Sequence, residues 1–198
     1  MCFMTILSPH WHLRNRLFNE EAAQIQPGGY VFLGNSLTEQ FDLSGYFPGL
    51  PVINRGISGD HIDGLLKRID TSVLLLQPSR LFIMIGINDI GDGKSNDYIL
   101  GLYTRLIRVL TEECRAVIYI QSLLPTGPQI SQCPPQQIKQ LNDSLNKLAA
   151  DDGLIYVDLY PHFIKKAPWM DPALTGDGLH LNRAGYELWT NLLKNYMF

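Results

Sequence analysis

The sequence predicts an α/β fold in which five parallel strands form one sheet with helices on both faces. Short apolar runs alternate with longer amphipathic stretches along the chain, which is the pattern of repeated parallel βα units. The chain has 198 residues, 45% of them hydrophobic, which is enough for one globular domain with a substantial core. No internal repeat or low-complexity segment interrupts the pattern. We therefore expect a single domain over residues 1–198.

Local signals predict each element in turn. Ser8 is a typical helix N-cap, and Pro9 is favoured as the first helical residue. The helix that they open is expected to run to about Gln26, because two glycines follow at 28 and 29. Apolar runs bounded by turn residues predict strands over residues 30–33, 51–54, 80–85, 116–121 and 155–158. Amphipathic stretches predict further helices over residues 61–70, 96–113, 135–151 and 183–196. The segment 126–135, rich in Pro and Gly, is expected to form an exposed flap.

Charge and hydropathy argue against nucleic acid and membrane partners. The net charge is -3 and no long run of Lys or Arg is present, so the chain lacks the electrostatic footprint of a nucleic-acid binder. The longest apolar runs, 73–76 and 81–87, are far shorter than the roughly 20 residues that span a bilayer. The N-terminal segment lacks a basic start and a small-residue cleavage site, which favours a cytoplasmic protein if the chain is whole. A homodimer is compatible with these properties.

The three cysteines, Cys2, Cys114 and Cys133, are scattered and lack the spacing of a metal site or a disulfide framework. We expect reduced thiols, with Cys114 packed in the core. Neither a metal nor a cofactor is expected.

A candidate catalytic pair lies near the C-terminus, where Asp177 and His180 are three residues apart. One turn of backbone can hold an acid against an imidazole at this spacing, and the acid then fixes the tautomer of the ring. Such a pair activates a serine hydroxyl, and Ser36 follows the first predicted strand, two residues after Gly34. Ligand sites of parallel sheets gather at the carboxyl ends of the strands. The sequence therefore predicts that Ser36, His180 and Asp177 meet there.

Two other strand-end loops supply hydrogen-bond donors. Gly59 has no side chain to block its own N–H group, and Asn88 can donate from its side-chain amide. With the N–H group of Ser36 they would form a three-donor oxyanion hole, each donor contributing on the order of 3–4 kcal/mol of transition-state stabilisation. This constellation indicates acyl transfer.

Four segments in this order resemble the four blocks of the SGNH, or GDSL-type, esterase and lipase superfamily: Gly34-Asn35-Ser36-Leu37-Thr38, Gly56-Ile57-Ser58-Gly59-Asp60, Gly86-Ile87-Asn88-Asp89 and Asp177-Gly178-Leu179-His180. The resemblance covers nearly the whole chain and implies a flavodoxin-like three-layer αβα sandwich. It also implies that Ser36 is the nucleophile, His180 the base and Asp177 its orienting acid, with Gly59 and Asn88 as oxyanion donors. The family usually has Asp where Asn35 stands. Because Asn is isosteric and can still bond nearby backbone, we expect the turn to persist.

Three other interpretations compete with this one. Ser58 is a rival nucleophile close to Asp60 and His61, but its segment lacks the second spacer of the G-x-S-x-G elbow. The segment 91–95 contains Gly-Lys-Ser, the tail of a phosphate-binding loop, which would predict a nucleotide binder. The full pattern requires glycine at position 88, where Asn88 stands. An inactive carbohydrate-binding module is disfavoured because the full catalytic set is intact. The remaining histidines, expected in solvated or capping roles, are His10, His12, His61 and His162.

The sequence says less about the substrate than about the chemistry. No amphipathic lid or exposed hydrophobic run suggests an interface-activated lipase, so a small soluble ester is favoured. The chain looks most similar to platelet-activating-factor acetylhydrolase subunits and carbohydrate acetylesterases, which implies removal of an acetyl group, for example from a sugar. Thioester or lysophospholipid hydrolysis is the alternative. Specificity is expected in the loops 42–50, 126–135 and 161–172, where Trp169 and Met170 either line a substrate pocket or pack in the core.

Overall fold

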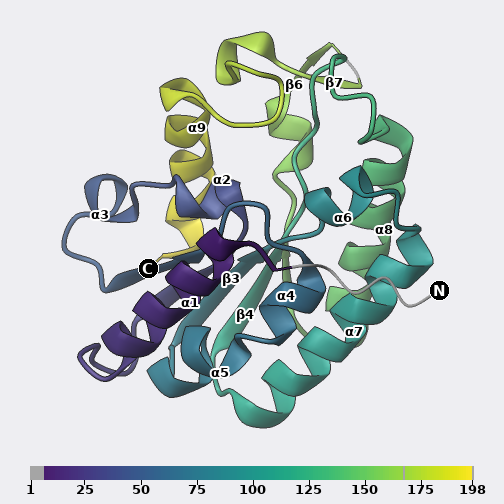
Figure 1. Ribbon diagram of the computed structural model, residues 1–198. Coiled ribbons are helices and arrows are strands. Elements are labelled where there is room, and N and C mark those ends of the chain that lie inside the picture. The colour runs from purple at the N-terminus through teal and green to yellow at the C-terminus, as the bar shows by residue number, and fades with distance from the viewer. Residues whose placement is uncertain (1–6, 167, 198) are drawn as a thin grey trace.

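The computed structural model describes residues 7–166 and 168–197, and its centre is a five-stranded parallel sheet of order β2-β1-β3-β4-β5 (Figure 1). The strands are β1 (Tyr30–Gly34), β2 (Val52–Gly56), β3 (Arg80–Met84), β4 (Val117–Gln121) and β5 (Ile155–Val157). This is the flavodoxin-like order, in which the chain turns back between β1 and β3. The predicted fold class is confirmed.

Helices cover both faces of the sheet. Right-handed crossovers place the connections that follow β2, β3 and β4 on one face, and the connection from β1 to β2 on the other. The first face carries α1 (Pro9–Ala22), α4 (Ile62–Leu66), α5 (Ile69–Ser72), α7 (Asn96–Glu113) and α8 (Pro135–Asp151). The second carries α2 (Ser36–Glu39), α3 (Leu43–Tyr46) and α9 (Arg183–Leu193), and Figure 1 shows α9 beside α2. Short elements complete the chain: α6 (Ile87–Gly91), η1 (Leu74–Leu76), η2 (Tyr160–Phe163), β6 (Ile164–Lys166), β7 (Trp169–Met170), η3 (Pro172–Leu174) and η4 (Lys194–Tyr196).

The two-residue period of the strands separates an aromatic layer from an aliphatic one. Phe32, Phe82 and Tyr119 are register partners on β1, β3 and β4, and their rings stack with centroids 4.6 and 4.5 Å apart. On the same face, the fully buried Trp189 of α9 stacks on Phe41 at 4.7 Å. Alternate positions on these strands face the larger helical layer and are aliphatic: Val31, Leu33, Leu81, Ile83, Ile118 and Ile120. Burial of each large apolar side chain contributes about 1.5–3 kcal/mol to folding stability. Docking of α9 on the aromatic face of the sheet is therefore favoured, because it buries these rings.

Several predicted boundaries are wrong for identifiable reasons. The first helix ends at Ala22 and not near Gln26. Pro27 disfavours helical conformation at Gln26 and has no N–H group to bond the Ala23 carbonyl, so the helix cannot continue through this segment. The helix predicted over 61–70 is broken into α4 and α5 at the point where the Arg68 side chain turns inward. The last helix, predicted over 183–196, changes to a 3₁₀ turn after Leu193. The β6–β7 hairpin was not predicted, since strands of two or three residues leave no period in the sequence.

The cysteine and flap predictions also need correction. Cys133, with 3% of its surface exposed, is the buried thiol, whereas Cys114 is half-buried at the edge of the core; Cys2 lies outside the described residues. The segment 126–135 is only partly exposed, because Thr126 is buried and donates to the Cys133 carbonyl at 3.3 Å. In the described part of the chain, no helix is long and apolar enough to cross a membrane.

Candidate active site

Ser36 stands at the carboxyl end of β1, as the first residue of α2. Asn35 caps this helix through its side-chain oxygen, which accepts from the Leu37 N–H group at 3.1 Å, so the turn expected around Asn35 is formed. The helix lies directly against the strand ends. A side chain at Gly56 of β2 would collide with the backbone nitrogen of Glu39, so only glycine permits this approach.

Asp177 and His180 are joined within one turn of backbone before α9. One carboxylate oxygen of Asp177 accepts from the N–H groups of Leu179 and His180 at 2.8 and 2.7 Å. Thr175 closes the turn, since its hydroxyl accepts from the Gly178 N–H group at 2.9 Å and donates to the His180 carbonyl at 2.6 Å. The spacing read from the sequence therefore forms the expected local structure.

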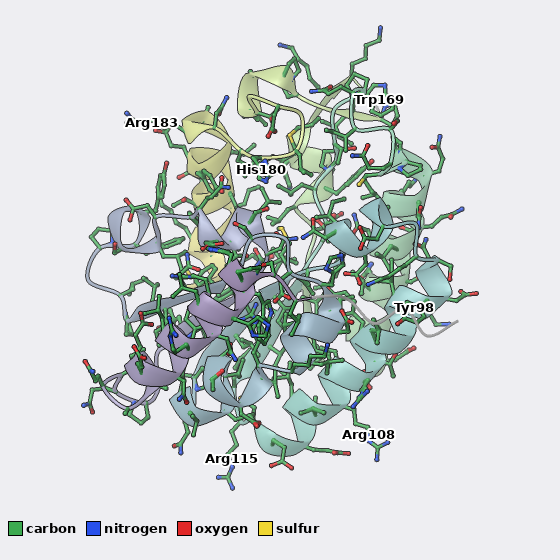
Figure 2. All side chains as sticks on the ribbon, in the orientation of Figure 1. Tyr98, Arg108, Arg115, Trp169, His180 and Arg183 are labelled. Atoms are coloured by element: carbon green, nitrogen blue, oxygen red, sulfur yellow. The ribbon has the colours of Figure 1, made fainter. Side chains whose placement is uncertain are left out.

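The structure brings Ser36, His180 and Asp177 into one chain of contacts. The Ser36 Oγ atom lies 3.0 Å from His180 Nε2, and His180 Nδ1 lies 2.7 Å from Asp177 Oδ2. Figure 2 places His180 at the carboxyl end of the sheet, beside α2. Partial burial pushes the pKa of Asp177 upward, but the hydrogen bonds from the His180 ring and from two backbone N–H groups lower it to about 2. The acid is therefore ionised at neutral pH and can hold the imidazole in one orientation.

Gly59 and Asn88 are also brought together, at a tight turn beyond β2. The Asp60 N–H group donates to the Ile57 carbonyl at 3.1 Å, and Gly59 has a φ of 76°. This is a type II turn, whose third residue needs a positive φ. The Asn88 amide donates to the Asp60 carbonyl at 2.8 Å, which orients it next to the turn. Within residues 7–166 and 168–197, the N–H groups of Ser36 and Gly59 bond no other protein group, so both can donate to a substrate.

The rival motifs have structural roles. Lys94 of the Gly-Lys-Ser segment forms a buried ion pair with Asp89, at 2.8 Å, and Ser95 caps α7. Near the rival nucleophile Ser58, the Asp60 carboxylate bonds Arg68 and the His61 ring faces Asp92 at 2.9 Å. These side chains are therefore engaged away from any nucleophile.

One of the four histidine predictions is wrong. His61 is buried, with 8% of its surface exposed, and although it stands at the N-cap position of α4 its ring makes no capping bond. Its Nε2 atom lies 2.9 Å from the Asp92 carboxylate, whose side chain is 60% exposed. His10 and His162 are exposed, and His10 lies 3.0 Å from the Glu39 carboxylate.

A hollow of about 410 Å³ adjoins the Asp177 turn. It lies between the loop after β4, the β6–β7 hairpin and the segment before α9, and its lining includes Trp169, Met170 and Pro128. Figure 2 shows Trp169 at the hairpin, above the sheet edge that carries His180. The loop after β4 is tied to the turn by Gln129, whose amide donates to the Asp177 carbonyl at 2.7 Å. Trp169 and Met170 thus line a pocket, as one of the two interpretations predicted, although Met170 is also part of the core.

Two residues that support the site, Glu39 and Arg68, were not predicted. Glu39 accepts from the Ser58 N–H group, and Arg68 donates to Asp60 and to the carbonyl groups of Gly34 and Arg55 at the strand ends. The available signals were an acid three residues after Ser36 and a cation among the apolar residues of the predicted helix 61–70. Neither signal indicates a partner, because both partners are distant in the chain. In the described part of the chain, no group of three or more His, Cys, Asp or Glu side chains could hold a metal ion.

A parallel sheet between two layers of helices, with Ser36, His180 and Asp177 in contact at its carboxyl edge, is the architecture of a carboxylic ester hydrolase. The chain belongs to the GDSL-like Lipase/Acylhydrolase family, whose model matches residues 26–188. The sequence-based resemblance is therefore confirmed, and the protein is a carboxylic ester hydrolase.

Individual relatives agree with this assignment. The chain is 26% identical over 150 residues to an acetylxylan esterase of Geobacillus stearothermophilus, covering 71% of this chain and 68% of the relative. A GDSL-like lipase of Bacteroides thetaiotaomicron superposes with a TM-score of 0.84 at 26% identity, covering 94% of this chain and 98% of that one. A Streptococcus pneumonia protein assigned as a platelet activating factor superposes with a TM-score of 0.90 at 23% identity, covering 97% and 94% of the two chains, which shows the shared fold.

Proposed function

We propose that this protein is a serine esterase that removes short acyl groups, above all acetyl, through an acyl-enzyme intermediate. The observation that carries the proposal is the continuous relay from Ser36 Oγ to His180 Nε2 at 3.0 Å and from His180 Nδ1 to Asp177 Oδ2 at 2.7 Å. These are the distances at which a base can take a hydroxyl proton while an acid holds the base in place.

The reaction proceeds in two half-reactions. Ser36 Oγ attacks the ester carbonyl carbon while His180 Nε2 takes its proton, and the carbonyl oxygen becomes an oxyanion. The N–H groups of Ser36 and Gly59 and the amide of Asn88 donate to that oxygen. His180 then protonates the leaving alcohol as the carbon–oxygen bond breaks. Water attacks the acyl-serine with His180 again as base, and the acid product and free Ser36 are released.

The acetyl preference is supported by the acetylxylan esterase relative, and a sugar as the alcohol part of the substrate is supported by the hollow beside Trp169. That relative is 26% identical over 150 residues, a similarity that spans most of this chain. The hollow beside Trp169 lies next to the Asp177 turn, where it would receive the alcohol part of the substrate. An aromatic wall with the polar side chains of Gln129 and Lys166 near it suits a sugar, which has both apolar ring faces and hydroxyl groups.

The serine mechanism is tested by Ser36→Ala, assayed with p-nitrophenyl acetate. Turnover is expected to vanish while the melting temperature changes little, since one hydroxyl is removed from the edge of the core. Ser144→Ala, at a partly exposed serine on α8, is the matched control and should keep full activity. Intact-mass analysis after a fluorophosphonate should show one adduct in the control and none in Ser36→Ala. Retained turnover in Ser36→Ala would overturn the proposal.

The acyl preference is tested with a series of p-nitrophenyl esters from acetate to octanoate, followed by acetate release from acetylated xylooligosaccharides. We expect kcat/KM to be highest for acetate. Rates that rise toward octanoate would contradict a short-acyl enzyme and favour a thioesterase or lysophospholipase.

A further inference from the structure

The oxyanion turn consists of residues 57–60, and its geometry sets the direction of the Gly59 N–H group. A four-residue turn of this kind can in general be of type I or type II. Type I and type II turns are related by a flip of the central peptide, which here joins Ser58 and Gly59. Glycine adopts positive and negative φ about equally well, so Gly59 does not by itself select the type II form. The φ of 76° must therefore be maintained by contacts on either side of this peptide.

The first contact comes from the helix that carries Ser36. The Ser58 N–H group donates to Glu39 Oε2 at 2.5 Å, which anchors the residue just before the central peptide. Glu39 is itself held by two side chains of α1, with His10 Nε2 at 3.0 Å and Arg14 Nε at 3.2 Å. Burial pushes the pKa of Glu39 upward, but the hydrogen bonds from Ser58 and His10 bring it below its usual value. Glu39 is thus a fixed carboxylate acceptor at neutral pH.

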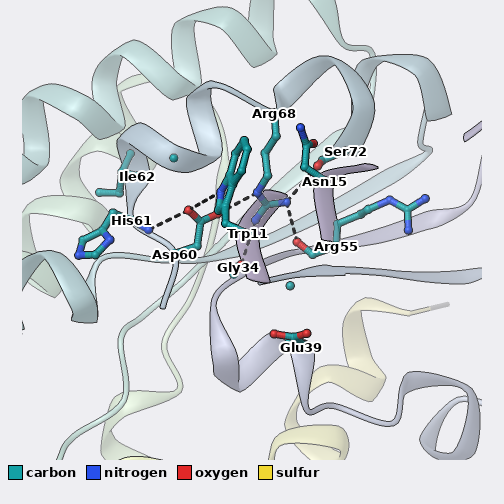
Figure 3. Close-up of polar contacts among 12 residues, drawn as sticks. Trp11, Asn15, Gly34, Glu39, Arg55, Asp60, His61, Ile62, Arg68 and Ser72 are labelled. Atoms are coloured by element: carbon teal, nitrogen blue, oxygen red, sulfur yellow. Dashed lines mark hydrogen bonds and ion pairs between the residues drawn. The ribbon is translucent and has the colours of Figure 1, made fainter. Parts of the chain in front are cut away.

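The second contact holds the other side of the turn, through the buried Asp60 (Figure 3). Asp60 Oδ2 accepts from Arg68 Nε at 2.8 Å, and Oδ1 accepts from Trp11 Nε1 and the His61 N–H group, both at 3.0 Å. The Arg68 guanidinium also donates to the Gly34 carbonyl at the end of β1, at 3.1 Å. Asp60 is therefore tied to the strand that leads to Ser36.

We propose that Glu39 is a positioning residue for ester hydrolysis, which holds the Ser58–Gly59 peptide so that the Gly59 N–H group points at the oxyanion. The inference rests on the proposed function of Ser36 and Gly59. The proposal also gives α1 a role, because its residues His10, Trp11 and Arg14 contact the two anchoring carboxylates, those of Glu39 and Asp60. This helix ends at Ala22, before residues 26–188, which match the family model.

Three substitutions separate the position of the acceptor from its charge. Glu39→Gln keeps an oxygen at the same reach and should stay close to the wild-type kcat on p-nitrophenyl acetate. Glu39→Asp keeps the charge but is one methylene too short to reach the Ser58 N–H group, and Glu39→Ala removes the acceptor. Both should lower kcat by about 10- to 100-fold, below the ~10²–10³-fold cost of deleting an oxyanion donor, with little change in KM. Glu112→Ala, which removes an exposed acid from α7, is the control and should keep the wild-type kcat.

A double-mutant cycle identifies the peptide as the point of action. Gly59→Ala disfavours a positive φ and should itself flip the turn, so adding Glu39→Ala should cost little more. Additive losses would overturn the proposal, and so would a wild-type kcat in Glu39→Ala or a better rescue by Glu39→Asp than by Glu39→Gln. Should Glu39→Ala fail to fold, Glu39→Asp and Glu39→Gln decide the matter alone. The proposed function fails separately, through retained turnover in Ser36→Ala.

Discussion

Replacing Asp177 by Asn gives a sharp test of the triad, because the structure dictates how the new amide must sit. The N–H groups of Leu179 and His180 donate to one carboxylate oxygen, at 2.8 and 2.7 Å. They will keep the Asn oxygen in that place, which turns its NH₂ group toward His180 Nδ1. That nitrogen must then accept, so the ring proton moves to Nε2. A protonated Nε2 cannot take the hydroxyl proton of Ser36.

The expected loss is large in rate and small in stability. Exchange of the triad acid for Asn lowers kcat by about 10⁴-fold in a serine protease, equivalent to about 5.5 kcal/mol of transition-state stabilisation. Lowering the pKa of Asp177 from 3.8 to about 2 corresponds to about 2.4 kcal/mol of folding stability. Since 56% of the Asp177 side chain is exposed, screening by solvent reduces this contribution to below about 1 kcal/mol. The melting temperature should then fall by no more than about 4 °C.

The assay compares kcat on p-nitrophenyl acetate with the melting temperature of the same samples. Asp171→Asn is the matched control, because Asp171 also accepts a backbone N–H bond, from Ala173 at 2.9 Å, but as the N-cap of η3 and without a histidine partner. The control should lose little of either quantity. A kcat within about tenfold of the wild type in Asp177→Asn would refute the role assigned to the acid.

Three further outcomes are expected. The stability that Asp177 contributes should be complete above about pH 4 and lost as pH falls toward 2, because its folded-state pKa lies below the ordinary 3.8. Urea unfolding should show the free energies of unfolding of the wild type and Asp177→Asn converging over this range. A constant difference between them would contradict the pKa shift. Trp169→Ala should raise KM for acetylated xylooligosaccharides about 5-fold more than KM for p-nitrophenyl acetate, through loss of about 1 kcal/mol of ring contact, and equal changes would place the sugar elsewhere. Gly56→Ala should cost about 1–3 kcal/mol and lower kcat, since its Cβ would displace Glu39 and with it the Ser36 helix; an unchanged melting temperature and rate would contradict the packing.

The sheet and the main residues of the candidate site could be predicted because each leaves a local signal in the sequence. Strands such as Tyr30–Gly34 are continuous apolar runs ended by glycine, and the Asp177 and His180 pair is defined by a spacing of three. The parallel topology then carries Ser36 and Asn88 to the same edge. Local pattern and global fold agree at these positions.

The supports of the site could not be predicted, because their partners are distant in sequence. Arg68 interrupts a predicted helix in order to reach Asp60, Gly34 and Arg55, and nothing in the residues around it indicates those contacts. For the same reason the sequence predicts a solvated or capping role for His61, although the fold buries this residue and its ring caps no helix. Burial of a polar side chain depends on what the tertiary structure offers it, and this is absent from hydropathy period and local spacing.

The distance in sequence between Ser36 and His180, 144 positions, has a consequence for folding. The imidazole reaches the serine only after α9 docks on the sheet, the same event that stacks Trp189 on Phe41 at 4.7 Å. Contacts of such long range close late, because loop closure must precede them. In a variant that keeps Trp189 and carries Trp11→Phe and Trp169→Phe, recovery of esterase turnover during refolding should therefore follow the change in tryptophan fluorescence. The return of catalysis would then mark completion of the fold.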